Sequence, residues 1–296
     1  MTGHTTLAVD WGTSSLRGAL LDRGGRVVAE RASDHGILRV PAGQFDVVFN
    51  SLFQDWLAQG PDLVLVSGMA GSQQGWVEAP YCPCPAGFAE IASKLIWLEP
   101  GRLAIVPGIS CQHAHAPDVM RGEEVQIFGA MSLTGLQDGL FVLPGTHSKW
   151  ATVRSGRVET FKTFMTGEVF ALLSQQSILA KTLDTLAPLD VVAFSQGVAL
   201  SQQSVGLLHG AFSARTLSLF KQKTPGQLAS YLSGLVIGDE LRSQSPAPGT
   251  SVILVGAPNL TSRYALAFDQ YGVATQALGA EATWAGLHAI RETLQT

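Results

Sequence analysis

Residues 7–17 read LAVDWGTSSLR, a short apolar run that ends in an aspartate and continues into a loop of small residues. The apolar start predicts a strand that ends near Asp10. Glycine, threonine and serine then form a loop with little side-chain bulk, which leaves backbone N–H groups open to a ligand. Such a concave run of amides binds phosphate oxygens, so the stretch predicts a phosphate loop between two strands.

A second stretch of the same kind follows half a chain later, where residues 140–161 read LFVLPGTHSKWATVRSGRVETF. Residues 12–15 (GTSS) align with residues 145–148 (GTHS), and each loop is followed by a strand, a tight turn and another strand. The repeat predicts a duplicated domain, with Gly-Thr turns that recur by chance as the alternative. Two such loops facing each other across a cleft would hold a polyphosphate from both sides.

The rest of the chain alternates between predicted strands and helices, as in a mixed α/β protein. Further strands are predicted at residues 16–22, 26–32, 62–68, 103–110 and 251–256. Helices are predicted at residues 45–59, 123–135, 167–183, 201–220, 224–244, 257–272 and 282–294. Pro258 should lie in the first turn of its helix, where its missing N–H costs nothing. The expected domains are residues 1–116 and 117–296, which should meet closely because the sequence contains no low-complexity linker.

Composition restricts the classes of function. Hydrophobic residues make up 46% of the 296 residues and charged residues 14%, and the net charge is −4. We therefore expect no general attraction to nucleic acid or to an anionic membrane. No apolar run reaches the roughly 18 residues of a membrane helix, and the start of the sequence has no signal-peptide pattern. Three cysteines, an odd and sparse set, favour a cytoplasmic location. A zinc site built from Cys82, Cys84, His113 and His115 is disfavoured, because there is no second closely spaced cysteine pair and the two halves lie far apart in the sequence.

Charged residues flank both loops. A carboxylate beside bound phosphates requires a cation, so Asp10 is the candidate Mg²⁺ ligand, directly or through water. Arg17 and Lys149 each follow a loop and would neutralise a transferred phosphoryl group. The alternatives are an aspartate that only forms a turn and a lysine whose amine reaches solvent.

The sequence contains no Walker motif and no GxGxxG fingerprint after a strand, which argues against a P-loop enzyme or a dinucleotide-binding domain.

Four further motifs accompany the loops, namely GMAGSQQGWVEAPYCPCP, DVMRGEEVQIFGA, TFMTGEVF and VGAPNLTSRY. The two loops resemble those of the actin-like ATPase superfamily. The combination of GMAGS, GWVEAPY and PGTHSKW resembles the 2-dehydro-3-deoxygalactonokinase family over nearly the full chain. The superfamily resemblance implies an α/β fold of two RNase H-like domains, with mixed sheets flanked by helices and an interdomain cleft. The family resemblance implies that ATP phosphorylates 2-dehydro-3-deoxy-D-galactonate to its 6-phosphate in galactonate breakdown.

The resemblance also implies roles for individual residues. A carboxylate base is expected near the start of the helix that crosses between the domains, where Glu123 is preferred over Asp118 and Glu124. Acidic residues at a helix start are also expected from the helix dipole alone. The predicted nucleotide contacts are Gly12, Thr13, Ser14, Arg17, Gly145, Thr146, His147, Ser148, Lys149, Gly256, Ala257 and Asn259. The predicted sugar-acid contacts are Gly71, Ser72, Gln73, Trp76, Glu78 and Tyr81.

Several alternatives stay open at this point. The substrate carboxylate could be bound by Arg121, by Lys162 or by amides at a helix start. Residues 233–240 (SGLVIGDE) are expected to line the other side of the adenine. Residues 165–168 are expected to approach either the substrate or the domain interface. A phosphohydrolase of the same superfamily is the alternative enzyme, and an ATP-dependent switch protein is the non-catalytic alternative. The stereochemistry of the sugar acid and the oligomeric state, including a homodimer, are not decided by the sequence.

Overall fold

A computed structural model describes residues 5–203 and 206–295, which divide into two compact units. The first unit contains the chain up to Gly139 together with Ala151–Lys162 and the segment from Leu278 onward. The second unit contains Leu140–Trp150 and Thr163–Ala277. These units are defined by which residues pack together. The boundary expected from the sequence, between residues 116 and 117, instead divides the chain into two copies of a repeated fold. That boundary stays a prediction.

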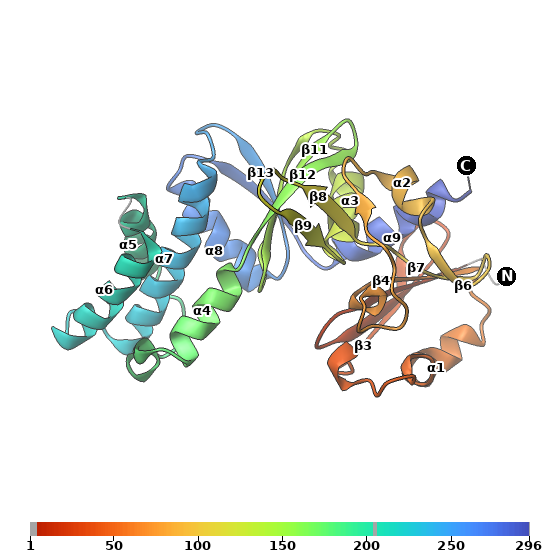
Figure 1. The fold of residues 1–296 in the computed structure, drawn as a ribbon, viewed down its shortest axis with the longest axis horizontal. Helices are drawn as coiled ribbons and strands as arrows, with labels where there is room; N and C mark the ends of the chain where they lie inside the picture. Colours follow the sequence, from red (N-terminus) through yellow and green to blue (C-terminus); the bar gives the residue numbers. More distant parts are fainter. Residues whose placement is uncertain (1–4, 204–205, 296) are drawn as a thin grey trace. The chain divides into compact units, whose positions relative to one another are not determined.

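The first unit is built on a six-stranded sheet with the order β3-β2-β1-β4-β7-β6 (Figure 1). Its strands are β1 (Thr6–Trp11), β2 (Leu16–Leu21), β3 (Val27–Ser33), β4 (Leu63–Gly68), β6 (Ile96–Glu99) and β7 (Leu103–Ile105). β1 runs antiparallel to β2 and parallel to β4, with Trp11 opposite Gly68. The loop at residues 12–15 and the segment after β4 therefore leave the sheet at the same edge.

Helices and a small sheet complete this unit. The helices are α1 (Phe45–Leu57), α2 (Phe88–Ala92), α3 (Glu123–Thr134) and α9 (Glu281–Thr293), with single 3₁₀ turns η1 (Ile37–Arg39) and η2 (Met69–Gly71). The small sheet, in the order β5-β8-β9, contains β5 (Cys82–Pro83), β8 (Ile109–Gln112) and β9 (Pro117–Met120). α3 and α9 cross closely because Gly129 and Gly286 lie at the contact, where an added Cβ would come within 1.6 Å of Ala282 O or 1.9 Å of Val125 O.

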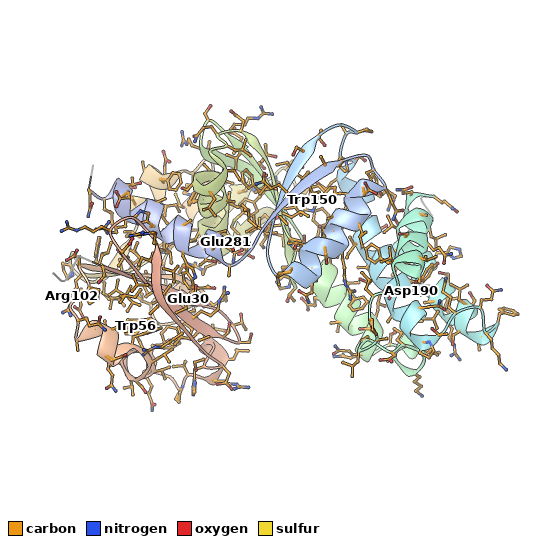
Figure 2. The ribbon with its side chains drawn as sticks, turned by 180° about the vertical axis from the view of Figure 1, so that it is seen from behind. Glu30, Trp56, Arg102, Trp150, Asp190 and Glu281 are labelled. Atoms are coloured by element: carbon orange, nitrogen blue, oxygen red, sulfur yellow. The ribbon has the colours of Figure 1, made fainter. Side chains whose placement is uncertain are left out.

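The spacing of apolar residues explains why residues 45–57 form a helix against this sheet. Phe45, Phe49, Phe53 and Trp56 lie on one face of α1 and are buried. The Arg31 guanidinium lies over the ring of Trp56, which is labelled in Figure 2, at 4.1 Å from the ring centre. Each fully buried aromatic side chain contributes about 1.5–3 kcal/mol to folding.

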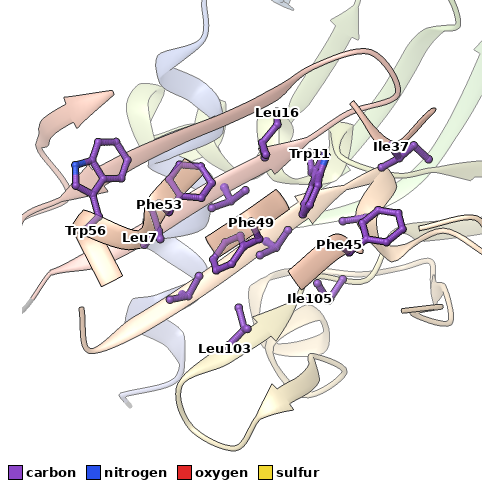
Figure 3. Close-up of a cluster of buried hydrophobic side chains, with 14 of the residues drawn as sticks. Leu7, Trp11, Leu16, Ile37, Phe45, Phe49, Phe53, Trp56, Leu103 and Ile105 are labelled. Carbon is purple, nitrogen blue, oxygen red and sulfur yellow. The ribbon is translucent and has the colours of Figure 1, made fainter. Parts of the chain in front are cut away.

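An aromatic cluster forms the core of the first unit (Figure 3). The ring centres of Trp11 and Phe45 lie 5.3 Å apart, and those of Phe49 and Phe53 are also 5.3 Å apart. Aliphatic residues of the strands, including Leu7 and Ile105, fill the same cluster. Because Trp11 directly follows Asp10 in β1, this packing fixes the strand end from which the Asp10 side chain projects.

The second sheet has the order β12-β11-β10-β13-β14. Its strands are β10 (Gly139–Leu143), β11 (Ser148–Arg154), β12 (Arg157–Phe164), β13 (Ser251–Val255) and β14 (Ala274–Leu278). In chain order this is third, second, first, fourth, fifth. The first four positions match β3-β2-β1-β4 in the first sheet, where the sixth strand of that sheet, β7, comes next. In both sheets the first strand is parallel to the fourth. The two predicted phosphate loops both join the first strand to the second, so the predicted duplication is confirmed.

Residues 151–162, which make up most of β11 and β12, are counted with the first unit, and outside this sheet the described part of the second unit is helical. Its helices are α4 (Thr166–Gln175), α5 (Val191–Gln202), α6 (Leu207–Leu219), α7 (Pro225–Gln244) and α8 (Pro258–Asp269), with the 3₁₀ segment η3 (Ile178–Thr182). α5 and α6 both pack against α7, as Figure 1 shows. Asp190, labelled in Figure 2, caps α5 by accepting a hydrogen bond from Ala193 N. Pro258 occupies the first turn of α8, as predicted.

Four predicted elements differ from the structure. Residues 103–110 form two strands of different sheets, because Pro107 lacks an N–H and interrupts the ladder. The helix expected at residues 167–183 ends at Gln175, since Ser177 caps the 3₁₀ segment that follows. The helix expected at residues 201–220 begins only at Leu207, after Gly206 with φ 75°, and residues 204–205 lie outside the described residues. Asp118, expected at a helix start, lies in strand β9, and the helix begins at Glu123.

Candidate active site

The first predicted phosphate loop is a compact turn that is fastened from behind. Gly12 N donates to Ser15 O at 2.9 Å, which closes the loop. Two backbone N–H groups of η1 donate to the loop carbonyls. Ile37 N donates to Gly12 O at 3.0 Å, and Leu38 N donates to Thr13 O at 3.3 Å. Thr13 and Ser14 at the tip are exposed. With its carbonyls occupied, the loop can present its tip to an anion.

Asp10 ends the strand before this loop and is paired with Arg17 across β1 and β2. Arg17 Nη2 lies 2.5 Å from Asp10 Oδ2, and the Asp10 side chain is 17% exposed. A side chain at Gly68 would bring its Cβ to 3.1 Å from Asp10 Oδ1, so a glycine with φ 87° is required there. Gly122 approaches the same point, because its Cβ would lie 3.3 Å from Gly68 Cα. The ends of β1 and β4 therefore meet the start of α3 beside Asp10.

The start of α3 carries two adjacent glutamates with different environments. Glu123 Oε2 accepts from Arg121 N at 3.0 Å, and the residue is partly exposed. Glu124 is fully buried, and its two oxygens accept from Gly122 N at 2.9 and 2.7 Å. Burial, reinforced by repulsion from Glu123, raises the pKa of Glu124 to about 8. Asp118, the second candidate base, accepts from the neighbouring Val119 N at 2.8 Å.

The raised pKa of Glu124 predicts a pH-dependent stability. The folded protein favours the protonated carboxyl, so its stabilising effect is complete below the unfolded value of 4.5 and is lost as pH rises through about 8. Chemical denaturation should show the free energy of unfolding falling over this window, by up to about 1.4 kcal/mol per pH unit. Glu124→Gln, which stays neutral, should remove this slope. An unchanged slope in that variant would show that other groups cause it.

The predicted sugar-acid loop contacts Arg121, which stands just before α3. Arg121 Nη2 donates to Ala79 O at 2.8 Å, and the guanidinium carbon lies 4.3 Å from the centre of the Tyr81 ring. A Cβ at Gly71 would come within 2.8 Å of Arg121 Nη1. Among the described residues, Arg121 Nε and Nη1 and Ser72 Oγ are buried without a hydrogen-bond partner. Unsatisfied buried donors of this kind are unusual and are consistent with a site for an anionic, hydroxylated ligand.

Two other members of the sugar-acid loop line a hollow to which Arg121 does not contribute. Gln73 and Trp76 line a hollow of about 410 Å³, together with Asp46 at the start of α1. The Trp76 ring also packs on the core, 5.2 Å from the Phe49 ring and 5.9 Å from the Trp11 ring between centres. Glu78 is exposed. Trp76 therefore has a structural role in the core in addition to any contact with substrate.

The second predicted phosphate loop is also backed by another segment. Glu168 N donates to Thr146 O at 3.1 Å, and Gly167 lies so close that a Cβ would meet Gly145 O at 2.4 Å. His147 Nε2 lies 2.6 Å from Glu168 Oε2. Residues 165–168, which the sequence left unassigned, thus fasten this loop to the start of α4. The arrangement parallels the backing of the first loop by η1.

Two predicted contacts beside this loop are buried. The Ser148 side chain is inaccessible, and its Oγ donates to Glu240 Oε1 at 2.8 Å. The Ser148 hydroxyl is therefore engaged with the core, and a phosphate contact from its backbone stays a prediction. Lys149 is 5% exposed and its Nζ donates to Thr163 Oγ1 at 2.9 Å, so its amine does not extend into solvent.

The second unit contains a cavity of about 210 Å³ next to this loop. The residues that line it are Gly145, Thr166, Gly167, Phe170, Ser233, Val236, Ile237, Asn259, Leu260, Arg263 and Tyr264. The cavity brings together Gly145 of the loop, Asn259 of the α8 turn, and Ser233, Val236 and Ile237 of α7. Gly256, at the end of β13, lies close to the loop, because its Cβ would be 3.4 Å from Pro144 O. Ala257 caps α8 directly after it.

Sequence reasoning did not assign three polar residues at this cavity. Thr166 and Tyr264 line it and both donate to the buried Glu240, and Arg263 Nη1 donates to Ser233 Oγ at 2.8 Å. Burial lowers the pKa of Arg263. The sequence contained a signal that Glu240 lies near this cavity. It follows Val236 by four positions and Ile237 by three, so the three residues share one face of the helix.

The alternative zinc site is not assembled in the described part of the chain. Within residues 5–203 and 206–295, no group of three histidine, cysteine, aspartate or glutamate residues is arranged to hold a metal ion. His113 Nε2 instead lies 2.8 Å from Phe161 O, and Cys82 and Cys111 are buried thiols. Over the same residues, no helix is both long enough and apolar enough to cross a membrane.

Comparisons with known proteins agree with one family. Residues 10–290 match the family described as 2-keto-3-deoxy-galactonokinase. Curated relatives named 2-dehydro-3-deoxygalactonokinase, from Rhizobium meliloti strain 1021 and Escherichia coli K12, are 36% and 33% identical over 95% and 96% of both chains. A solved structure described as such a protein from Sinorhizobium meliloti has a TM-score of 0.89 at 33% identity, covering 98% of this chain and 99% of that one.

A more distant structure shows the fold class. The activator of 2-hydroxyisocaproyl-CoA dehydratase from Clostridium difficile, solved with ADPNP bound, has a TM-score of 0.52 at 12% identity. It covers 98% of this chain and 96% of its own. The predicted α/β class with the actin-like ATPase fold is thereby confirmed.

Proposed function

The chain belongs to the 2-keto-3-deoxy-galactonokinase family, and on that premise we propose that it transfers the γ-phosphoryl group of ATP to the terminal hydroxyl of 2-dehydro-3-deoxy-D-galactonate. The product is the 6-phosphate, an intermediate of galactonate breakdown. The observation that carries the proposal is the pair of small-residue loops, each between the first and second strands of a sheet whose first four strands have the order third, second, first, fourth. Nothing in the comparisons favours the phosphohydrolase alternative.

For the nucleotide, we assign the adenosine to the cavity between α7, α8 and the second phosphate loop. Asn259 and Gly145 line this cavity, and the apolar side chains of Val236 and Ile237 suit a flat base. Thr13, Ser14 and Thr146 are at exposed loop tips, where backbone amides would bind phosphate oxygens. Arg17 and Lys149 would neutralise the phosphoryl group, Arg17 by exchanging its present partner Asp10 for phosphate.

For the acceptor, we assign the sugar acid to the loop after β4. Ser72 Oγ and the Arg121 guanidinium hold buried donors that need an acceptor, and Tyr81 covers the guanidinium. Arg121 is therefore our choice for the substrate carboxylate, to which its planar fork is matched. Glu123, at the first residue of α3, would accept the proton of the attacking hydroxyl.

A magnesium ion fits the residues present. Asp10 offers a partly buried carboxylate, and Mg²⁺ bound with nucleotide typically uses one or two protein carboxylates, with phosphates and waters as its other ligands. When bound, the ion would neutralise charge on the phosphates. Asp10 would orient it, directly or through water.

The proposal is tested by measuring ADP formation with ATP, Mg²⁺ and sugar acids of galacto and gluco configuration. We expect ADP to form only when a 2-dehydro-3-deoxy sugar acid is present, in equimolar amount with a phosphorylated sugar. Release of inorganic phosphate at the same rate without sugar would instead identify a phosphohydrolase. A control with water as the sole acceptor measures that background directly.

Compartment and assembly are also proposals. The three cysteines, Cys82, Cys84 and Cys111, are all free thiols, which suits the reducing cytoplasm. For assembly we include a homodimer, which light scattering on the purified chain would test. The substrates are small molecules, and the net charge of −4 offers no general attraction to nucleic acid.

A further inference from the structure

A buried carboxylate lies at the centre of the second unit. Glu240, on α7, is 3% exposed, and its two oxygens accept four side-chain hydrogen bonds. Ser148 Oγ and Trp150 Nε1 donate to Oε1 at 2.8 and 2.5 Å. Tyr264 OH donates to Oε2 at 2.6 Å, and Thr166 Oγ1 donates to the same oxygen.

The four donors come from the segments that surround the cavity. Ser148 is the last residue of the second phosphate loop and the first residue of β11, and Trp150 follows it in that strand. Thr166 is the first residue of α4, whose next two residues back that loop through Gly145 and Thr146. Tyr264 is on α8, which carries Asn259. One carboxylate is therefore bonded to the loop, to its backing helix and to the helix on the opposite side of the cavity.

Stability alone does not account for a carboxylate at this point. Removing a carboxylate from water is costly, and burial raises the pKa of Glu240 above its usual value. The surrounding core is apolar and aromatic, including Trp150, Phe268 and Val198. An apolar side chain of similar size would avoid the desolvation cost, provided its neighbours were also apolar. Four directed hydrogen bonds, in contrast, fix the relative positions of their donors.

We propose that Glu240 is a positioning residue for nucleotide binding, which sets the spacing between the second phosphate loop and helix α8. The inference rests on the proposed assignment of adenosine to the cavity. Glu240 does not line the cavity, and it acts through Thr166 and Tyr264, which do. Nucleotide affinity should therefore depend on this carboxylate more strongly than the affinity for the sugar acid, whose proposed contacts are on other segments.

Glu240→Gln is the main test, because it keeps the size of the side chain and removes two of its acceptor positions. An amide oxygen can still accept from Trp150 and Ser148, but the NH₂ group then faces the hydroxyls of Thr166 and Tyr264, which must turn to accept. We expect the Kd for ADP, measured by calorimetry on the full chain, to rise about tenfold, which is the loss of one good hydrogen bond to a charged group. The KM for ATP should rise similarly and the KM for the sugar acid should change less than about twofold.

Two further variants separate positioning from folding. Val198→Ala creates a cavity in the same core cluster, on α5, and Val198 neither lines the nucleotide cavity nor donates a hydrogen bond to Glu240. It should lower Tm while leaving the Kd for ADP within about twofold. Tyr264→Phe removes a single donor and should raise the Kd for ADP in the same direction as Glu240→Gln. It provides the test if the latter variant does not fold.

The outcomes show whether the inference about Glu240 or the proposed nucleotide site is wrong. If Val198→Ala weakens ADP binding as much as Glu240→Gln does for the same loss of Tm, Glu240 is only structural and the inference is wrong. The same holds if ADP binds equally well to the wild type, Glu240→Gln and Tyr264→Phe. If the wild-type chain binds no adenine nucleotide, the assignment of the cavity fails and the inference fails with it.

Discussion

Asp10→Asn is expected to lower kcat about 10²- to 10³-fold at saturating ATP, sugar acid and Mg²⁺, with the fold intact. The expected loss corresponds to the several kcal/mol of charge stabilisation that an oriented metal supplies. Asparagine keeps the shape of the side chain and its place beside Gly68, but it cannot offer a charged oxygen to a cation. Steady-state kinetics over a range of Mg²⁺ concentrations measure the effect, and circular dichroism confirms folding.

A matched control separates the metal from the loss of an ion pair. Asp55 is also an aspartate paired with an arginine, since Arg31 Nη1 lies 2.7 Å from its Oδ1, but the pair lies on α1 and β3. Asp55→Asn removes the same charge and should leave kcat near its wild-type value, because exposed pairs contribute at most about 1 kcal/mol to stability. Near-normal turnover of Asp10→Asn would rule out its role with the metal and leave it as a partner of Arg17.

The elements that the sequence predicted correctly are those set by local spacing. In β1, β2 and α1 the apolar residues recur at a clear spacing. The two loops are recognisable because small residues separate the apolar strands on either side. The shared order of the first four strands in the two sheets then follows from the repeat itself. Pro258 and the α8 turn were also predictable, because proline is compatible with the first turn of a helix.

The features that were missed depend on contacts distant in sequence. Asp118 was expected at a helix start, but pairing between β8 and β9 places it in a strand opposite Cys111. The environment of Glu124 follows from the packing of α3, and periodicity does not distinguish it from Glu123. Glu240 was not singled out because its four donors are 24 to 92 positions away. No local pattern reveals such a set of partners.

Glu123→Gln is expected to lower kcat about 10²- to 10⁴-fold, the range for loss of a general base, with little change in the Kd for ATP. Glu123 starts α3 at the junction where Gly122 approaches Gly68 beside Asp10. Asp118, in contrast, lies in β9 and is bonded to the next backbone N–H. Single-turnover measurements with bound ATP would report the transfer step itself. Asp118→Asn should leave that step within about threefold of the wild type.

Glu281→Gln is the control that removes the helix-dipole explanation. Glu281 is the first residue of α9, and its Oε1 accepts from Gly279 N at 2.7 Å, two positions earlier, as Glu123 Oε2 does from Arg121 N. A glutamate at a helix start contributes about 0.3–1 kcal/mol through the dipole, so both variants should lose similar stability. Only Glu123→Gln should lose transfer. If Asp118→Asn blocks transfer and Glu123→Gln does not, the base is the strand aspartate, and the acceptor hydroxyl approaches from β9 rather than from the helix start.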